Sequence, residues 1–174
     1  MKKFLLLCIA MLFLSACLSK QKGENLFSIP DKLDVYLLNH VRGFHYPTIE
    51  ELSQTMVSKF YETQEVENHP SFLKADFTGD DHADYAFILP LDSAYRDSIF
   101  VIINSKETPG ENTKDEDSIS YDFMFFFFGL NNSYKNDYLS FEEGVLVRNT
   151  VTGNAVSFSW DENSKTYKQV GTLK

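Results

Sequence analysis

The sequence predicts an α+β domain in which N-terminal helices pack on a mainly antiparallel β-sheet. Two observations support this fold class. Apolar residues recur at helical spacing before residue 61, whereas aromatic and β-branched runs bounded by Gly, Pro, Asn and Asp dominate from Phe72 onward. Helices followed by strands are typical of α+β domains. About 150 residues follow the N-terminal segment, which is enough for one domain with its own core.

The first predicted helix begins at Asp31, which can cap it, and Gly43 is a natural stop. Its apolar face repeats every four residues and consists of Leu33, Leu37 and Val41.

A second helix is predicted to begin at Thr48, because Thr48 and Glu51 have the spacing of a capping box. Its apolar positions are Ile49, Leu52, Met56 and Phe60. We interpret this face as core packing rather than as a binding groove.

Six later segments are predicted strands: 83–89, 98–103, 119–128, 145–148, 155–161 and 166–170. Residues 161–165 should close a hairpin between the last two. The continuous apolar run Met124–Phe128 predicts a central strand, and Trp160 should be largely buried beside it. The polar stretch 105–118 is predicted to be a mobile surface loop, where a partner could bind.

The N-terminus has the layout of a secretory signal, with Lys2 and Lys3 followed by an apolar run over 4–14. This run is too short to span a bilayer. It ends at Leu14-Ser15-Ala16-Cys17, which resembles the lipobox of bacterial lipoproteins. The resemblance implies a signal peptide over 1–16 and a diacylglyceryl group on Cys17. The alternative is an ordinary secretory signal that contains a cysteine.

A lipid on Cys17 would hold the protein on a membrane, because more than one acyl chain gives stable anchoring. Residues 17–25 then form the lipidated cysteine and a flexible tether, and 26–174 form a single globular domain. Leu18 follows the cysteine where the sorting rule of enteric bacteria reserves aspartate for the inner membrane. By that resemblance, we expect an outer-membrane location facing the periplasm.

The chain is acidic, with a formal net charge of −9 that becomes more negative when Lys2 and Lys3 leave with the signal. This charge argues against nucleic acid and anionic lipid head groups as partners and favours a basic protein partner. Cys8 would also leave with the signal, so no cysteine remains for a disulfide once Cys17 carries lipid. The oligomeric state cannot be predicted.

One segment carries a metal-binding pattern, because oxygen-bearing residues alternate around a turn. Calcium prefers six to eight oxygen ligands, and a tight loop supplies them from alternate positions. The candidate ligands are Asp76, Thr78, Asp80, the His82 carbonyl and Asp84.

The segment resembles the calcium loops of FG-GAP and VCBS-type repeats in Asp76, Phe77, Gly79, Asp80 and Asp84. The resemblance implies a bound calcium ion, whereas a single copy does not imply a propeller. Two positions depart from the family pattern: Thr78 replaces a carboxamide, and Asp81 replaces a glycine that takes a left-handed turn. The alternative is a metal-free turn whose carboxylates accept backbone amides.

No other pattern indicates chemistry. The four histidines lack zinc-ligand spacing, and no nucleophile elbow, phosphate loop or dinucleotide fingerprint is present. We therefore expect a lipid-anchored, non-catalytic protein-interaction domain, with calcium as a candidate stabilising ion. A specific version is an immunity-type inhibitor of a toxin in the envelope. The alternative from another class is an envelope hydrolase with scattered catalytic residues.

Overall fold

The computed structural model describes residues 29–64, 68–92, 98–107, 119–129 and 133–173. The predicted signal peptide, Cys17 and the tether lie outside these ranges. So does most of the predicted loop 105–118, whose first three residues belong to a strand. Within the described residues, no helix is both long and apolar enough to cross a membrane.

The described chain is mostly β, with eight strands in two antiparallel sheets and two short α-helices. The first sheet has the order β1-β2-β3-β4, formed by Phe72–Ala75, Asp84–Pro90, Ser98–Glu107 and Ile119–Gly129. The second has the order β5-β6-β7-β8, formed by Asp137–Glu142, Val145–Thr150, Ala155–Asp161 and Thr166–Leu173. The α+β expectation thus holds coarsely, but helices are a minor part and there are two sheets.

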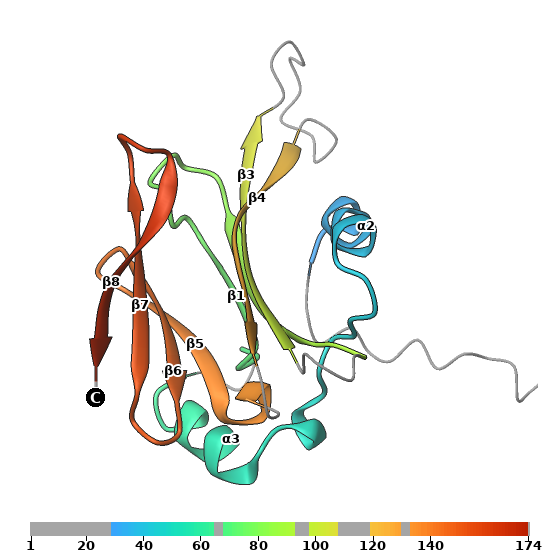
Figure 1. Cartoon of the computed structure of the whole chain (residues 1–174), viewed down its shortest axis with the longest axis vertical. Coiled ribbons are helices and arrows are strands. Elements are labelled where there is room, and N and C mark those ends of the chain that lie inside the picture. The colour runs from blue at the N-terminus through green and yellow to red at the C-terminus, as the bar shows by residue number, and fades with distance from the viewer. Residues whose placement is uncertain (1–28, 65–67, 93–97, 108–118, 130–132, 174) are drawn as a thin grey trace, which may run out of the picture.

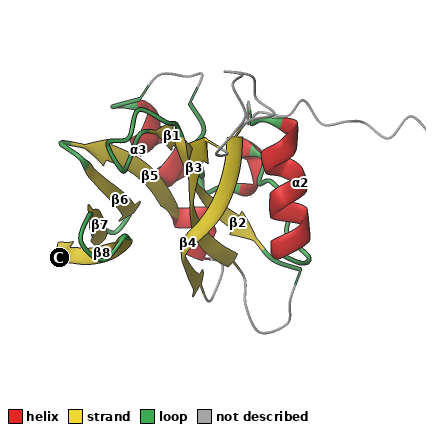
Figure 2. Cartoon of the chain, turned by 90° about the horizontal axis from the view of Figure 1, so that it is seen from above, coloured by secondary structure: helices red, strands yellow, loops and turns green. Residues whose placement is uncertain are grey.

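The first sheet is the middle layer of the molecule, with α2 (Asp31–His40) on one face and the second sheet on the other (Figures 1 and 2). Strand alternation produces this arrangement, since successive side chains point to opposite faces. In β2, Tyr85, Phe87 and Leu89 join α2, whereas Ala86 and Ile88 face the second sheet. Phe100 of β3 contacts Phe158 of β7 between the sheets, with ring centroids 5.3 Å apart.

The apolar face of helix α2 is as predicted, because Leu33, Leu37 and Val41 are all buried against the first sheet. The predicted cap is wrong, because Asp31 is the first residue of the helix and Pro30 is its N-cap, with no side-chain cap hydrogen bond. The helix ends at His40, and Gly43 adopts a left-handed φ of +66° shortly after it. The Tyr36 hydroxyl of α2 accepts a hydrogen bond from the Phe123 amide of β4.

The second helix begins later than predicted, as α3 (Gln54–Tyr61) with Ser53 as its N-cap. The segment Ile49–Glu51 is instead a single 3₁₀ turn (η1), and the Thr48 side chain makes no cap hydrogen bond. The capping-box prediction is wrong because Leu52 is extended and separates the two turns, while Glu51 accepts a hydrogen bond from His45. Met56 and Phe60 are buried as expected in the core between the sheets. Helix α3, which carries them, stands at one end of the sheets (Figure 1).

The prediction of a central strand over Met124–Phe128 is wrong, because β4 is an edge strand that pairs only with β3 in the described sheet. An apolar run indicates coverage of a strand's faces, not pairing of both its edges. The β3–β4 register skips Met124, since Ile102 pairs with Phe125 and Ile103 with Phe123. Such a bulge redirects the side chains beside it.

Candidate functional site

The loop that joins β1 to β2 is organised around the carboxylate of Asp76. One oxygen, Oδ1, accepts the Gly79 amide at 2.6 Å, the Asp80 amide at 3.2 Å and the Thr78 hydroxyl at 3.4 Å. The other, Oδ2, accepts the Asp81 amide at 2.9 Å. Partial burial raises the pKa of Asp76, but these donors outweigh it and hold the pKa below its usual range.

The carboxylate of Asp84 fastens the other end of the loop to the sheet. It is fully buried at the start of β2 and accepts the amides of Phe77 at 2.9 Å and Thr78 at 3.1 Å. Its second oxygen accepts the Ser105 amide of β3 at 3.1 Å. Burial raises the pKa of Asp84 to about 6, against the lowering effect of these donors.

Two residues of the loop have left-handed backbones, as the turn requires. Gly79 has φ of +78°, and Asp81 has φ of +66°. Aspartate is one of the few non-glycine residues that adopt this conformation readily. Asp81 thus takes the conformation expected of the glycine it replaces.

The described geometry is that of a turn whose carboxylates bind backbone amides. A carboxylate offers about four lone-pair sites, and Asp76 already accepts four hydrogen bonds. The side chain of Asp80 accepts the His82 amide at 3.0 Å. In the part of the chain that the structure describes, no three His, Cys, Asp or Glu side chains form a group suited to a metal ion. Asp76 and Asp84 thus direct their carboxylate oxygens at backbone amides, and calcium binding by the five candidate ligands stays a prediction.

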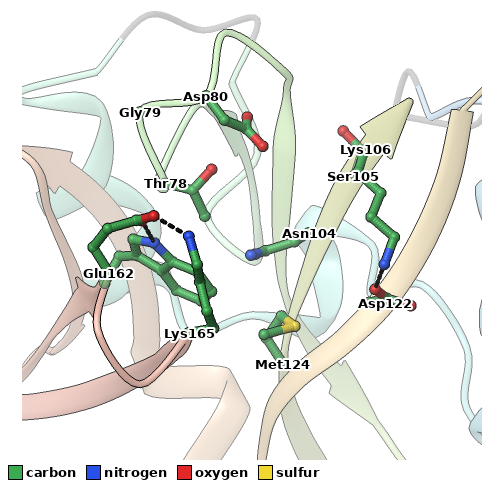
Figure 3. Close-up of a pocket in the computed structure, with 11 residues that line it drawn as sticks. Thr78, Gly79, Asp80, Asn104, Ser105, Lys106, Asp122, Met124, Glu162 and Lys165 are labelled. Carbon is green, nitrogen blue, oxygen red and sulfur yellow. Dashed lines mark hydrogen bonds and ion pairs between the residues drawn. The ribbon is translucent and has the colours of Figure 1, made fainter. Parts of the chain in front are cut away.

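A cavity of about 450 Å³ lies beside this loop (Figure 3). The loop stands at the opposite end of the sheets from α3 (Figure 1). The cavity is lined by the loop, by β3 and β4 of the first sheet, and by β7 and the β7–β8 turn of the second. The lining residues are Thr78, Gly79, Asp80, Asn104, Ser105, Lys106, Asp122, Met124, Trp160, Glu162 and Lys165. The size is within the usual range for small-ligand sites.

The cavity exists because apolar faces of the strands become polar at this end. In β3, Phe100 and Ile102 lie in the core between the sheets, and Asn104 and Lys106 follow at the same two-residue spacing. In β7, Phe158 is followed by Trp160. On β3 and β4, polar Asn104, Lys106 and Asp122 occupy the positions that would continue the core, so water-accessible space replaces close packing.

Two ion pairs belong to the cavity wall, one from each sheet (Figure 3). Lys106 of β3 pairs with Asp122 of β4, and Lys165 pairs with Glu162 in the β7–β8 turn. Hydrogen bonds from Lys165 and from the Trp160 indole hold the pKa of Glu162 below its usual range. Asp80 is the third acidic residue of the lining, and no ion pair to it forms among the described residues.

Hydrogen bonds fix the orientation of Trp160 and Asn104. The Trp160 indole donates to Glu162 at 2.8 Å, and its ring lies 5.2 Å from that of Tyr167. The Tyr167 hydroxyl donates to the Asn104 side-chain oxygen at 2.9 Å. This bond leaves the amide nitrogen of Asn104 directed into the cavity (Figure 3).

Comparison with protein-family models, with curated proteins and with solved structures gives no match for this chain.

Trp160 packs against the core between the sheets but is only partly buried rather than largely buried, because one side of it lines the cavity. No sequence pattern predicted a binding role for Trp160, Asn104, Asp122, Glu162 or Lys165. Lys106 was predicted only as part of a mobile loop where a partner could bind, but it belongs to β3. One signal was present, namely the change from apolar to polar residues along one face of the 98–107 strand. It becomes informative only when the facing strand is known.

Proposed function

We propose that this chain is a lipid-anchored protein of the bacterial cell envelope whose domain binds a basic protein partner and catalyses no reaction. The lipobox-like sequence ending at Cys17 supports the anchor, and the acidity of the chain supports the charge of the partner. The proposed location is the outer membrane facing the periplasm.

The observation that carries the binding role is the fixed acidic surface of the β1–β2 loop. Asp80 and Asp81 are exposed, and neither forms an ion pair with a described lysine, arginine or histidine. The backbone amides that bind Asp76 hold the loop in one conformation. Carboxylates that are preorganised in this way lose little entropy when a cationic surface docks on them.

A pull-down from envelope extract tests this role with matched charge variants. The Asp80→Asn/Asp81→Asn protein should retain a stoichiometric basic partner at least about tenfold less tightly than wild type. Glu50→Gln/Glu62→Gln removes the same charge from two exposed residues at the α3 end and should bind like wild type. If both variants lost the same amount of affinity, the effect would come from net charge alone. That result would contradict a specific binding surface on the β1–β2 loop.

The anchor has its own experiment, detergent phase partitioning of wild type and Cys17→Ser. Wild type should enter the detergent phase, whereas the serine variant should stay in the aqueous phase because it cannot receive the lipid. A serine variant that still enters the detergent phase would show that the lipobox interpretation is wrong.

Calcium bound to the β1–β2 loop is a further part of the proposal. It would neutralise the loop's carboxylates and stabilise the fold, at the cost of hydrogen bonds that Asp76 and Asp84 now accept.

A further inference from the structure

We propose that the cavity between the two sheets binds a neutral saccharide unit. This inference goes beyond the protein interaction proposed above and rests on a different observation, the chemistry of the cavity wall. Of the side chains that line the cavity, three are acidic and two are basic, and the two basic ones are ion-paired.

The charge of the wall disfavours an anionic ligand. Asp122 and Glu162 are neutralised by their lysines, so Asp80 remains as an unbalanced negative charge. Asp76 and Asp84 lie close behind, since they accept hydrogen bonds from the backbone amides of residues that line the cavity. A carboxylate or phosphate would therefore meet repulsion.

The hydrogen-bonding groups of the wall disfavour a simple cation. The Asn104 side-chain nitrogen is a donor, because its oxygen is already bound by Tyr167. Lys106 and Lys165 add ammonium donors on opposite walls. A guanidinium or ammonium group carries only donors, so it would leave the Asn104 nitrogen without an acceptor and would lie beside two ammonium groups of its own charge.

A ligand that carries both donors and acceptors satisfies this wall. Each sugar hydroxyl donates one hydrogen bond and accepts others, so it can donate to Asp80 and accept from Asn104 or a lysine. The apolar part of the lining consists of Met124 and Trp160, which can cover the C–H face of a sugar ring. Because Glu162 holds the indole in place, binding does not require the ring to be ordered.

Trp160 is the only tryptophan in the chain, so its fluorescence reports directly on this cavity. The full chain, kept in a detergent without a sugar head group, is titrated with glucose, galactose, N-acetylglucosamine and their neutral oligomers. At least one should change the fluorescence saturably, whereas spermine and citrate should not. The proposal would be overturned if none of the neutral sugars changed the fluorescence. It would also be overturned if spermine or citrate, and not a sugar, gave a saturable change.

Two adjacent aspartates provide a matched comparison. Asp80 lines the cavity and Asp81 does not, although both are exposed. Asp80→Asn should weaken the sugar by about tenfold, the value of one hydrogen bond to a charged group, and Asp81→Asn should leave it unchanged. Asn104→Ala should weaken it similarly. An equal response to Asp80→Asn and Asp81→Asn would also overturn the proposal.

Sugar binding and partner binding can fail separately. A protein that loses its basic partner with Asp81→Asn but keeps the sugar would separate the loop surface from the cavity. Urea midpoints of each variant show whether a loss comes from unfolding rather than from the site.

Discussion

The space between the two sheets ends in two different ways. At one end, Met56 and Phe60 of α3 fill it and are buried within the core. At the other end, Asn104, Lys106 and Asp122 stand where core residues would continue, and a cavity opens. One end therefore contributes stability through burial, whereas the other leaves space and polar groups for a ligand. This chain assigns packing and binding to opposite ends of the same layer.

The largest effect should come from emptying the filled end. Phe60→Ala should lower the free energy of unfolding by about 3–5 kcal/mol, since it removes a large buried ring and leaves a hole. Urea denaturation measures the change.

Met124→Ala is the matched truncation at the open end, where the side chain is only partly buried beside existing space. It should cost about 1 kcal/mol. Equal costs at the two ends would break the comparison.

The next effect concerns Asp84, which fastens the β1–β2 loop beside the cavity. Its pKa of about 6 in the folded chain lies above the usual 3.8, so the folded state binds the proton more tightly. The protonated Asp84 carboxyl therefore contributes to the free energy of unfolding. This contribution is fully present below about pH 4 and is lost as the pH rises through about 6. The loss should approach about 3 kcal/mol, and urea midpoints between pH 4 and 7 measure it.

Asp84→Asn is the control, because asparagine does not titrate. Burial lowers the pKa of His69 to about 4, which gives a slope of opposite sign in the same pH range. Subtracting the variant's pH profile removes the contribution of His69 and isolates Asp84. Parallel profiles for the two proteins would contradict the assignment.

Local sequence patterns identified most of the fold. Helix α2 and strands β2, β3, β4, β6, β7 and β8 overlap predicted elements, since their apolar spacing or β-branched runs are strong local signals. The short strands β1 and β5 were not assigned. The division into two sheets was also missed, because it depends on pairing between segments rather than on any one segment.

The candidate site was partly visible in the sequence. The Asp76–Asp84 segment indeed forms an ordered acidic loop, but the crowding of its carboxylates does not by itself require a cation. Backbone amides supply much of the compensating positive potential, and a sequence does not show where amides point. The cavity could not be predicted, since Asn104 and Trp160 belong to different sheets and line one cavity only after the two sheets pack.

Calcium should have a smaller effect than Phe60→Ala or the titration of Asp84. With a dissociation constant on the order of 10⁻⁴ to 10⁻³ M, about 10 mM calcium should stabilise the fold by about 1.4–2.7 kcal/mol. The melting temperature should then rise by roughly 3–10 °C. Asp80→Asn should abolish the rise, whereas Asp81→Asn, outside the candidate ligand set, should keep it. A wild-type melt that does not respond to calcium would leave the segment as a hydrogen-bonded turn.

The smallest effect should come from the ion pair between Lys106 and Asp122 on the cavity wall. Their side chains are 58% and 49% exposed, and exposed pairs contribute about 0.2–1 kcal/mol. A double-mutant cycle with Lys106→Met and Asp122→Asn should therefore give a coupling energy within that range, and added salt should reduce it.

The pair between Arg148 and Asp137 provides the contrast within the same protein, because its side chains are only 10% and 4% exposed. Asp137→Ala should cost about 3–5 kcal/mol, since it leaves a buried charge without its partner. If the coupling energy between Lys106 and Asp122 approached this value, the open end would contribute to stability as the packed end does, and the contrast between the two ends would be wrong. A weak coupling means that the wall of the cavity can rearrange around a ligand at little cost to the fold.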